Sequence, residues 1–182
     1  MKKKNKKKNK KKMKSLSIIL LIIISSSFST HIRKNEEWNR STIYIGADDI
    51  LVSVKLNDNP VDLSEYGNYM DKYAIIKKAS LVLFPGDELV FYVKNSGPIT
   101  NLNPAALGVR IEYVDQEGNS QTFLSTSNQW TCDGYPPLVN GSVGTNLKYI
   151  LWRANGLGGD VQLIWGRDQK ENTVCRFEIP SS

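Results

Sequence analysis

Apolar and polar residues alternate with a period of two along most of the chain after residue 41, and Gly, Pro, Asn or Asp interrupts the alternation at intervals of roughly ten residues. In Glu88–Lys94, for example, Leu89, Phe91 and Val93 share one face. No segment of about ten residues in this region has the period of an amphipathic helix. The pattern therefore predicts an all-β protein, folded as an antiparallel β-sandwich or jelly roll.

The predicted strands are short, and turn-forming residues or polar loops separate them. They are Thr42–Gly46, Asp49–Leu56, a short return strand beginning at Val61, Ala74–Phe84, Glu88–Lys94, Leu107–Val114, Gln121–Thr126, Leu147–Trp152, Val161–Trp165 and Val174–Ile179.

Some of these strands also predict which side chains face the core. In Asp49–Leu56 the apolar residues Ile50, Val52, Val54 and Leu56 alternate, which predicts a common buried face. Trp152 and Trp165 lie inside strand patterns and are predicted to be core residues. Long polar loops are expected at 63–73, 95–105 and 128–144.

The N-terminus has the order of a secretory leader. Ten lysines occur in Met1–Lys14, the nine-residue apolar segment Leu16–Ile24 follows, and the small residues of Ser25–Thr30 come next. A helix needs about twenty apolar residues to cross a bilayer, so a cleaved signal peptide is favoured over a retained anchor. We expect a leader at 1–29, a linker at 30–40 and a β-sandwich domain at 41–182.

The net charge changes sign when this leader is set aside. The whole chain carries +6, but from Arg33 onward fourteen Lys and Arg face eighteen Asp and Glu, a net charge of −4. Phosphate binding needs clustered cations, and the only adjacent pair of lysines in this part is Lys77 and Lys78. Nucleic acid is therefore not expected as a partner, and a membrane would be contacted only through a leader that is not cleaved.

Two cysteines, Cys132 and Cys175, are the only ones in the chain. In an oxidising compartment an even pair favours one disulfide, and two buried free thiols are the alternative. Asn39 and Asn140 each begin a glycosylation sequon, which fits a secreted or cell-surface glycoprotein.

Several segments, taken in order, resemble galactose-binding-like β-sandwich modules, the jelly rolls that accompany many glycosidases and lectins. They are Ala47–Asp49, Leu56–Asp58, Leu83–Asp87, Ala105–Gly108, Ser125–Trp130, Leu163–Gly166 and Cys175–Ile179. The resemblance implies a jelly-roll fold and binding of sugars or other surface polymers. The chain departs from the pattern where Asp58, rather than glycine, follows Asn57, and in a long loop at 62–73.

Aromatic residues in the loops are the candidates for sugar binding. An exposed ring can stack on the C–H face of a pyranose while polar neighbours bond its hydroxyl groups. The alternative for the tryptophan is core packing beside the disulfide. The candidate ligand-binding residues are Trp130, Tyr135, Tyr66, Tyr69, Asn128 and Asp133.

Asp48, Asp49 and Asp58 could contribute to a structural calcium site, the one cofactor that the sequence suggests. Calcium takes about six to eight oxygen ligands, and three aspartates supply only part of that number. The alternative is that these side chains accept hydrogen bonds from the backbone of turns.

Catalytic chemistry is not expected. The only histidine, His31, lies beside the leader, so no Ser–His or Cys–His pair is available in the domain. A glycosidase would need two facing carboxylates, and the candidates are Glu88, Glu112, Glu117 and Asp133. The sequence therefore predicts a secreted, non-catalytic carbohydrate-binding module, with an adhesive protein-binding domain or a small secreted hydrolase as alternatives.

Overall fold

The computed structural model describes residues 40–66, 76–100, 105–115, 117–126, 128–145 and 149–181. The predicted leader, His31, the sequon at Asn39 and the candidate Tyr69 lie outside these residues. Residues 39–182 form one compact unit. Within the described part of the chain, no helix is both long and apolar enough to cross a membrane.

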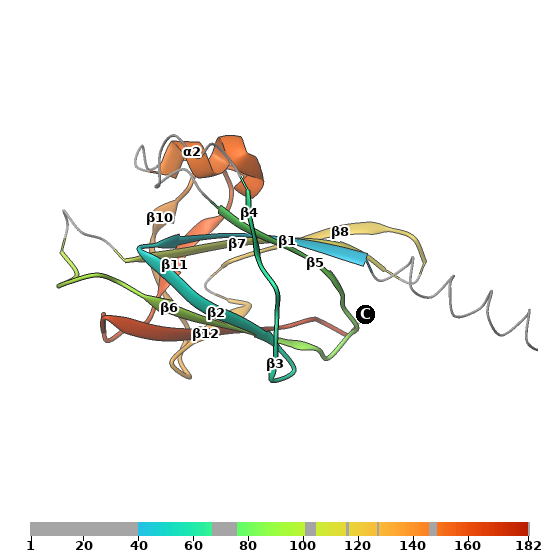
Figure 1. Ribbon diagram of the computed structural model, residues 1–182, viewed down its shortest axis with the longest axis horizontal. Coiled ribbons are helices and arrows are strands. Elements are labelled where there is room, and N and C mark those ends of the chain that lie inside the picture. Colours follow the sequence, from blue (N-terminus) through green and yellow to red (C-terminus); the bar gives the residue numbers. More distant parts are fainter. Residues whose placement is uncertain are drawn as a thin grey trace, which may run out of the picture. The chain divides into compact units, whose positions relative to one another are not determined.

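Two antiparallel sheets form a β-sandwich, which confirms the predicted all-β class (Figure 1). Sheet A contains, in spatial order, β10 (Leu138–Ser142), β11 (Gln162–Trp165), β7 (Ala106–Val114), β1 (Arg40–Asp48), β5 (Ile76–Val82) and β4 (Ser64–Tyr66), with β8 (Ser120–Leu124) also paired to β7. Sheet B contains β3 (Asn59–Pro60), β2 (Ile50–Leu56), β6 (Glu88–Lys94), β12 (Asn172–Glu178) and β9 (Trp130–Cys132).

The main core lies between the two sheets and follows the predicted alternation. In β6, Leu89, Phe91 and Val93 are buried, and in β7 every second residue from Leu107 to Tyr113 is buried. Each strand therefore contributes one apolar face to the interior, as a half-buried strand must.

The predicted buried face of β2 is wrong at its first two positions. Ile50 is exposed and Val52 is 60% exposed, whereas Leu51, Val54 and Leu56 belong to the core. The register between β2 and β6 shifts between Leu51 and Ser53, so a β-bulge inserts one extra residue there. A bulge reverses the alternation on either side of it, and strict period-two counting fails across it.

The predicted strand Leu147–Trp152 is wrong, because its described residues are helical. A short helical cap runs through α2 (Ile150–Trp152) and the π-helical turn η2 (Arg153–Leu157). Tyr149 and Trp152 are buried while Ile150 and Leu151 are exposed, which is the spacing of one helix face. A short apolar run does not distinguish a strand from a buried helical turn. Trp152 and Trp165 are both buried, as predicted.

Three short strands lie where long loops were predicted. β4 falls within the predicted loop 63–73, and β9 and β10 fall within 128–144. The return strand of the first hairpin is β3, two residues earlier than Val61, and Asn57 and Asp58 form its turn with positive φ. A two-residue hairpin turn of this kind requires positive φ at both positions, which Asn and Asp tolerate.

The cap covers one end of the outer face of sheet A, the face turned away from sheet B (Figure 1). Its residues Tyr149, Trp152 and Leu157 form a second apolar cluster with Ile76 of β5 and Ala106 of β7. The close approach depends on Gly46 in β1, since a Cβ atom there would lie 2.5 Å from the Trp152 ring. Farther from the cap, Ser80 and Val82 of β5 are exposed on this face.

The predicted disulfide is present between Cys132 of β9 and Cys175 of β12. The two residues face each other directly in sheet B, with Cα atoms 4.0 Å apart, and both side chains are fully buried. The bridge links β9, the edge strand of sheet B, to its neighbour β12. A disulfide fits a protein that folds in an oxidising compartment.

A buried hydrogen bond joins the cap to β1. The Tyr149 hydroxyl donates to Oδ2 of Asp48 at 2.6 Å, and both residues are almost fully buried. Burial, followed by the hydrogen bond and the charge of Asp48, raises the pKa of Tyr149 well above its usual value of 10.0. The phenol therefore stays protonated in the folded protein at a pH where an unfolded chain has lost this proton.

We expect this pair to make the protein sensitive to alkali. Above pH about 10 the unfolded state releases the Tyr149 proton and the folded state keeps it, so stability falls as pH rises by about 1.4 kcal/mol per unit for this group. Tyr149→Phe should cost about 1–3 kcal/mol at pH 7 and should make the decline above pH 10 shallower. Urea unfolding from pH 7 to 11 measures both effects.

The exposed Tyr135 provides the control, since Tyr135→Phe removes a hydroxyl without touching the cap and should leave stability at pH 7 unchanged. An alkaline decline as steep in Tyr149→Phe as in the unmodified protein would contradict the assignment.

Candidate functional site

Trp130 is not available for stacking on a ligand. Its side chain is 2% exposed, and its ring stacks on Phe177 with ring centres 4.9 Å apart. The indole Nε1–H donates to the carbonyl of Leu124 at 3.1 Å, so its polar atom is also engaged inside the fold. The burial of Trp130 agrees with the core-packing alternative for this residue.

Tyr135 is exposed, as a ligand-binding ring must be. Its side chain is 63% exposed, and it lies directly after a tight turn in which Asp133 and Gly134 both have positive φ. Asn128 is also exposed, and its side chain accepts a hydrogen bond from Thr126. For Tyr66 the structure describes only the backbone, in β4, so it does not test the role of this side chain.

Asp133 has a structural role in this loop. Its Oδ1 accepts from the backbone N–H of Val174 at 2.9 Å, and its Oδ2 accepts from the Thr173 hydroxyl at 3.2 Å. The carboxylate thereby fastens the turn to the start of β12. With Trp130 buried and Asp133 committed to β12, the predicted loop site retains Tyr135 and Asn128 among its described side chains.

The three aspartates proposed for calcium do not converge. Asp48 is buried against Tyr149, and Asp49 accepts from the backbone N–H of Ser96 at 2.8 Å. Asp58 lies beyond the other end of β2 from Asp49. A strand rises about 3.3 Å per residue, so β2 separates the two residues by roughly 20 Å. Among the described residues, no three His, Cys, Asp or Glu side chains could hold a metal ion together. The structure therefore does not bring these three carboxylates together around one ion.

The four candidate catalytic carboxylates lie on separate elements. Glu88 pairs with Arg176 at 2.8 Å on sheet B, and Glu112 pairs with Arg110 at 2.8 Å on sheet A. Glu117 lies in the turn after β7, where it accepts from the side chain of Asn119. The side chain of Asp133 is bound to β12. These four candidates therefore do not bring two carboxylates to one cleft.

That same turn holds a polar network around Asp115. Its carboxylate accepts the backbone N–H groups of Glu117 and Asn119 and a side-chain N–H of Gln121. The backbone hydrogen bond from Asn119 is the main reason that the pKa of Asp115 is lowered. These hydrogen bonds hold the turn of the hairpin formed by β7 and β8.

The outer face of sheet A, in the part not occupied by the cap, carries a groove with a volume of about 810 Å³. Residues from β1, β5, β7 and β8 line it. They are Arg40, Ser41, Thr42, Ser80, Leu81, Val82, Arg110, Glu112, Tyr113, Val114, Ser120, Gln121 and Thr122.

Strand pairing arranges the groove in rows across the sheet. Thr42 lies opposite both Ser80 and Glu112, and Glu112 lies opposite Thr122. This row places three hydroxyl groups and one carboxylate across four strands. The next row toward the cap holds Lys78, Tyr44 and Arg110.

A salt bridge joins Arg110, in the groove row nearest the cap, to Glu112 in the next row. The guanidinium Nη2 lies 2.8 Å from Oε1 of Glu112, and Nη1 donates to the carbonyl of Gly156 in the cap at 3.4 Å. Nε of Arg110 is buried and finds no acceptor in the part of the chain that the structure describes. The arrangement places a cationic donor and an anionic acceptor side by side, which suits a ligand whose neighbouring groups both donate and accept.

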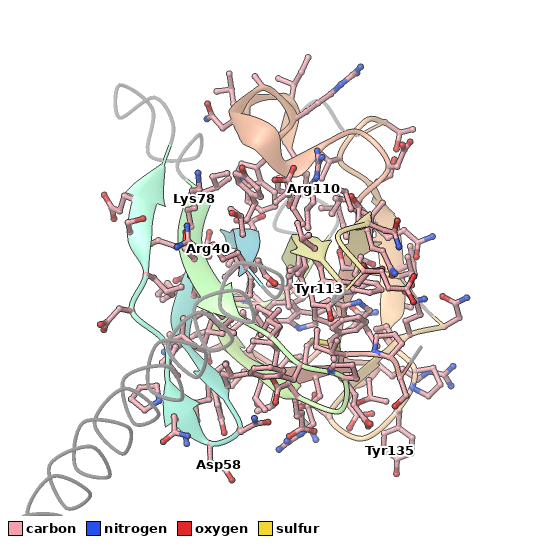
Figure 2. All side chains as sticks on the ribbon, turned by 90° about the vertical axis from the view of Figure 1, so that its right-hand side faces the viewer. Arg40, Asp58, Lys78, Arg110, Tyr113 and Tyr135 are labelled. Atoms are coloured by element: carbon pink, nitrogen blue, oxygen red, sulfur yellow. A yellow bond between two sulfur atoms is a disulfide. The ribbon has the colours of Figure 1, made fainter. Side chains whose placement is uncertain are left out.

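Figure 2 separates this groove from the loop candidates. Arg40, Lys78 and Arg110 lie in the upper half of this view, whereas Asp58 and Tyr135 lie at its bottom. Sequence reasoning missed the groove, although its polar residues Thr42, Ser80 and Glu112 alternate with core residues in predicted strands. Only the pairing of those strands brings the four sets together.

Comparison of the chain with protein-family models, with curated proteins and with solved structures gives no significant match. The assignment to the β-sandwich class therefore rests on the structure itself.

Proposed function

We propose that this protein is a secreted, non-catalytic module that binds carbohydrate in the groove on the outer face of sheet A. One observation carries the proposal: the groove presents hydroxyl groups together with the paired Arg110 and Glu112 on a rigid sheet. Sugar hydroxyls each donate and accept, so neighbouring hydroxyls can bond a carboxylate and a guanidinium that are held side by side.

Apolar surface in the groove supports the same ligand. Val82 and Val114 lie at the end of the groove that is farther from the cap, and Val82 is exposed. The C–H faces of a pyranose can pack on such side chains while its hydroxyls bond the polar row. The resemblance to galactose-binding-like modules agrees with carbohydrate as the ligand class, but it would favour the loops, where Tyr135 is the exposed aromatic candidate.

Secretion is part of the proposal. The lysine-rich leader favours export, and the buried Cys132–Cys175 bridge fits an oxidising compartment. Asn140 of the second sequon lies in β10, where its Nδ2 donates to the carbonyl of Ala105 at 2.9 Å. Glycosylation at this position stays a prediction.

A steric block of the groove tests the proposal. The full chain, expressed through a secretory pathway so that the disulfide forms, is screened against an array of soluble polysaccharides. Ser80→Trp places a large ring in the groove at an exposed strand position and should reduce binding at least tenfold. Thr131→Trp, at an exposed position on the outer face of sheet B, should leave the affinity unchanged.

Tyr135→Ala separates the two candidate sites. If the groove binds the glycan, this variant keeps its affinity; if the loop binds it, Tyr135→Ala loses binding and Ser80→Trp does not. The absence of binding to every polysaccharide on the array would contradict the proposed function and would favour a protein-binding domain.

A further inference from the structure

The charge of the groove is opposite to that of the domain around it. Arg40 and Arg110 line the groove, and Lys78 lies on the same outer face in the adjacent row, whereas Glu112 is the one acidic side chain among the lining residues. Three cations and one carboxylate leave a local charge of +2 on a domain whose net charge is −4. Figure 2 shows the three cationic residues on the same side of the molecule.

From this local charge, we propose that the groove binds an acidic polysaccharide, in which some sugar units carry a carboxylate. This inference rests on the proposed carbohydrate function and names its ligand class. A concave surface with one sign of charge raises the local concentration of ligands with the opposite sign, and the effect weakens with salt.

Arg40 is the residue most available to a ligand carboxylate. Its side chain is exposed, and among the described residues it has no acidic partner. A guanidinium matches the planar carboxylate group through two parallel hydrogen bonds, which is a better fit than a single point charge makes. Arg110, by contrast, is committed to Glu112 and to the cap, so it serves mainly the neutral part of the ligand.

Lys78 adds a positive charge in the same row as Arg110, near the cap. Its Nζ lies 5.2 Å from the centre of the Tyr44 ring. Lys78 and Arg110 lie on either side of Tyr44 in the sheet, which puts their backbones about 10 Å apart at the usual strand spacing. Lys78 and Arg110 lie one row nearer the cap than the row of hydroxyl groups, and Arg40 lies one row beyond it. Hydroxyl groups thus separate the two rows that hold cations, a spacing that a hydroxylated polymer with carboxylates can match.

The same surface is poorly suited to an acidic peptide bound as an added strand. β1 is paired on both sides, with β5 and β7, and β7 is paired on its other side with β8 and β11. Over β1 and β7, the central strands of the groove, a ligand therefore meets side chains and no free backbone edge, which strand addition needs. Hydroxyl-bearing side chains between the cations match a hydroxylated ligand instead.

The test compares two forms of one polymer, polygalacturonate and its methyl ester, which have the same backbone and differ in charge. Isothermal titration calorimetry with the full chain should give at least tenfold tighter binding of the acid form at low salt. This difference should shrink as salt is raised, because dissolved ions screen the attraction between exposed charges, with a Debye length of about 10 Å at 0.1 M.

Matched substitutions locate the effect. Arg40→Gln and Lys78→Gln should each weaken binding of polygalacturonate about threefold to fivefold, the effect of one exposed ion pair. Arg176→Gln and Lys55→Gln are the controls on sheet B. Lys55 is a close match to Lys78, since its Nζ lies 5.4 Å from the centre of the Tyr92 ring. Both controls should stay within twofold of the unmodified protein.

Three results would overturn the inference. Equal affinity for the acid and the ester, lost in Ser80→Trp, would leave the proposed function intact and remove the acidic ligand class. Polyglutamate binding as tightly as polygalacturonate would show that charge alone is recognised and would favour an acidic protein partner. No binding of either polysaccharide, with the array also negative, would remove the proposed function together with this inference.

Discussion

Replacing Trp130 by alanine is expected to lower the free energy of unfolding by about 3–5 kcal/mol, the usual cost of deleting a buried aromatic ring. The ring packs against two others, and its centre is 5.2 Å from that of Phe91 and 4.9 Å from that of Phe177. A domain is stable by about 5–15 kcal/mol in total, so this loss is a large share. Urea unfolding followed by near-ultraviolet circular dichroism measures it.

Tyr135→Ala is the matched control, since it deletes an exposed ring five residues further along the chain. This change should alter stability by no more than about 0.5 kcal/mol. A Trp130→Ala protein with unchanged stability and abolished glycan binding would show instead that Trp130 contacts the ligand.

Loss of the disulfide is expected to have an effect of similar size. The bridge closes a loop with a sequence separation of 43. Opening it should cost about 3–4 kcal/mol, mainly because the unfolded chain regains freedom. For a domain of this size such a loss lowers the melting temperature by roughly 10 °C. Thermal melts with and without a thiol reductant give the shift directly.

The double variant Cys132→Ala, Cys175→Ala controls for other effects of the reductant. It should melt near the temperature of the reduced protein and should not respond to the reductant. Native labelling of free thiols in the unmodified protein, or a melt that reductant does not move, would contradict the bridge.

The strands of this fold could largely be predicted because each carries its own alternation. β6 and β7 show this most clearly, since their buried residues are the ones that the pattern marks. The disulfide could be predicted as well, because the chain has only two cysteines and a leader that favours export.

Two errors in the fold have local physical causes. The bulge at Val52 is a property of the pairing between β2 and β6, and nothing in the residues of β2 alone reveals it. The residues just before Arg153 are apolar in a strand-like way, and the sequence does not reveal that Trp152 packs against Gly46 of β1.

The site was harder to predict than the fold. Sequence reasoning followed the loop aromatics, yet the ring of Trp130 completes the core and the side chain of Asp133 fastens β12. The groove residues Thr42, Ser80 and Glu112 come from three strands that are far apart in the sequence. Their proximity is set by strand order, which a single sequence does not reveal.

The helical cap also limits the path of any long ligand. Trp152 and Leu157 close the outer face of sheet A at one end, so a polymer running parallel to the strands would collide with them. A chain can lie flat only when it runs crosswise, over β5, β1, β7 and β8. Three strand spacings give a footprint of about 14 Å, so the protein would recognise a short stretch of a long chain and leave the remainder free for neighbouring copies.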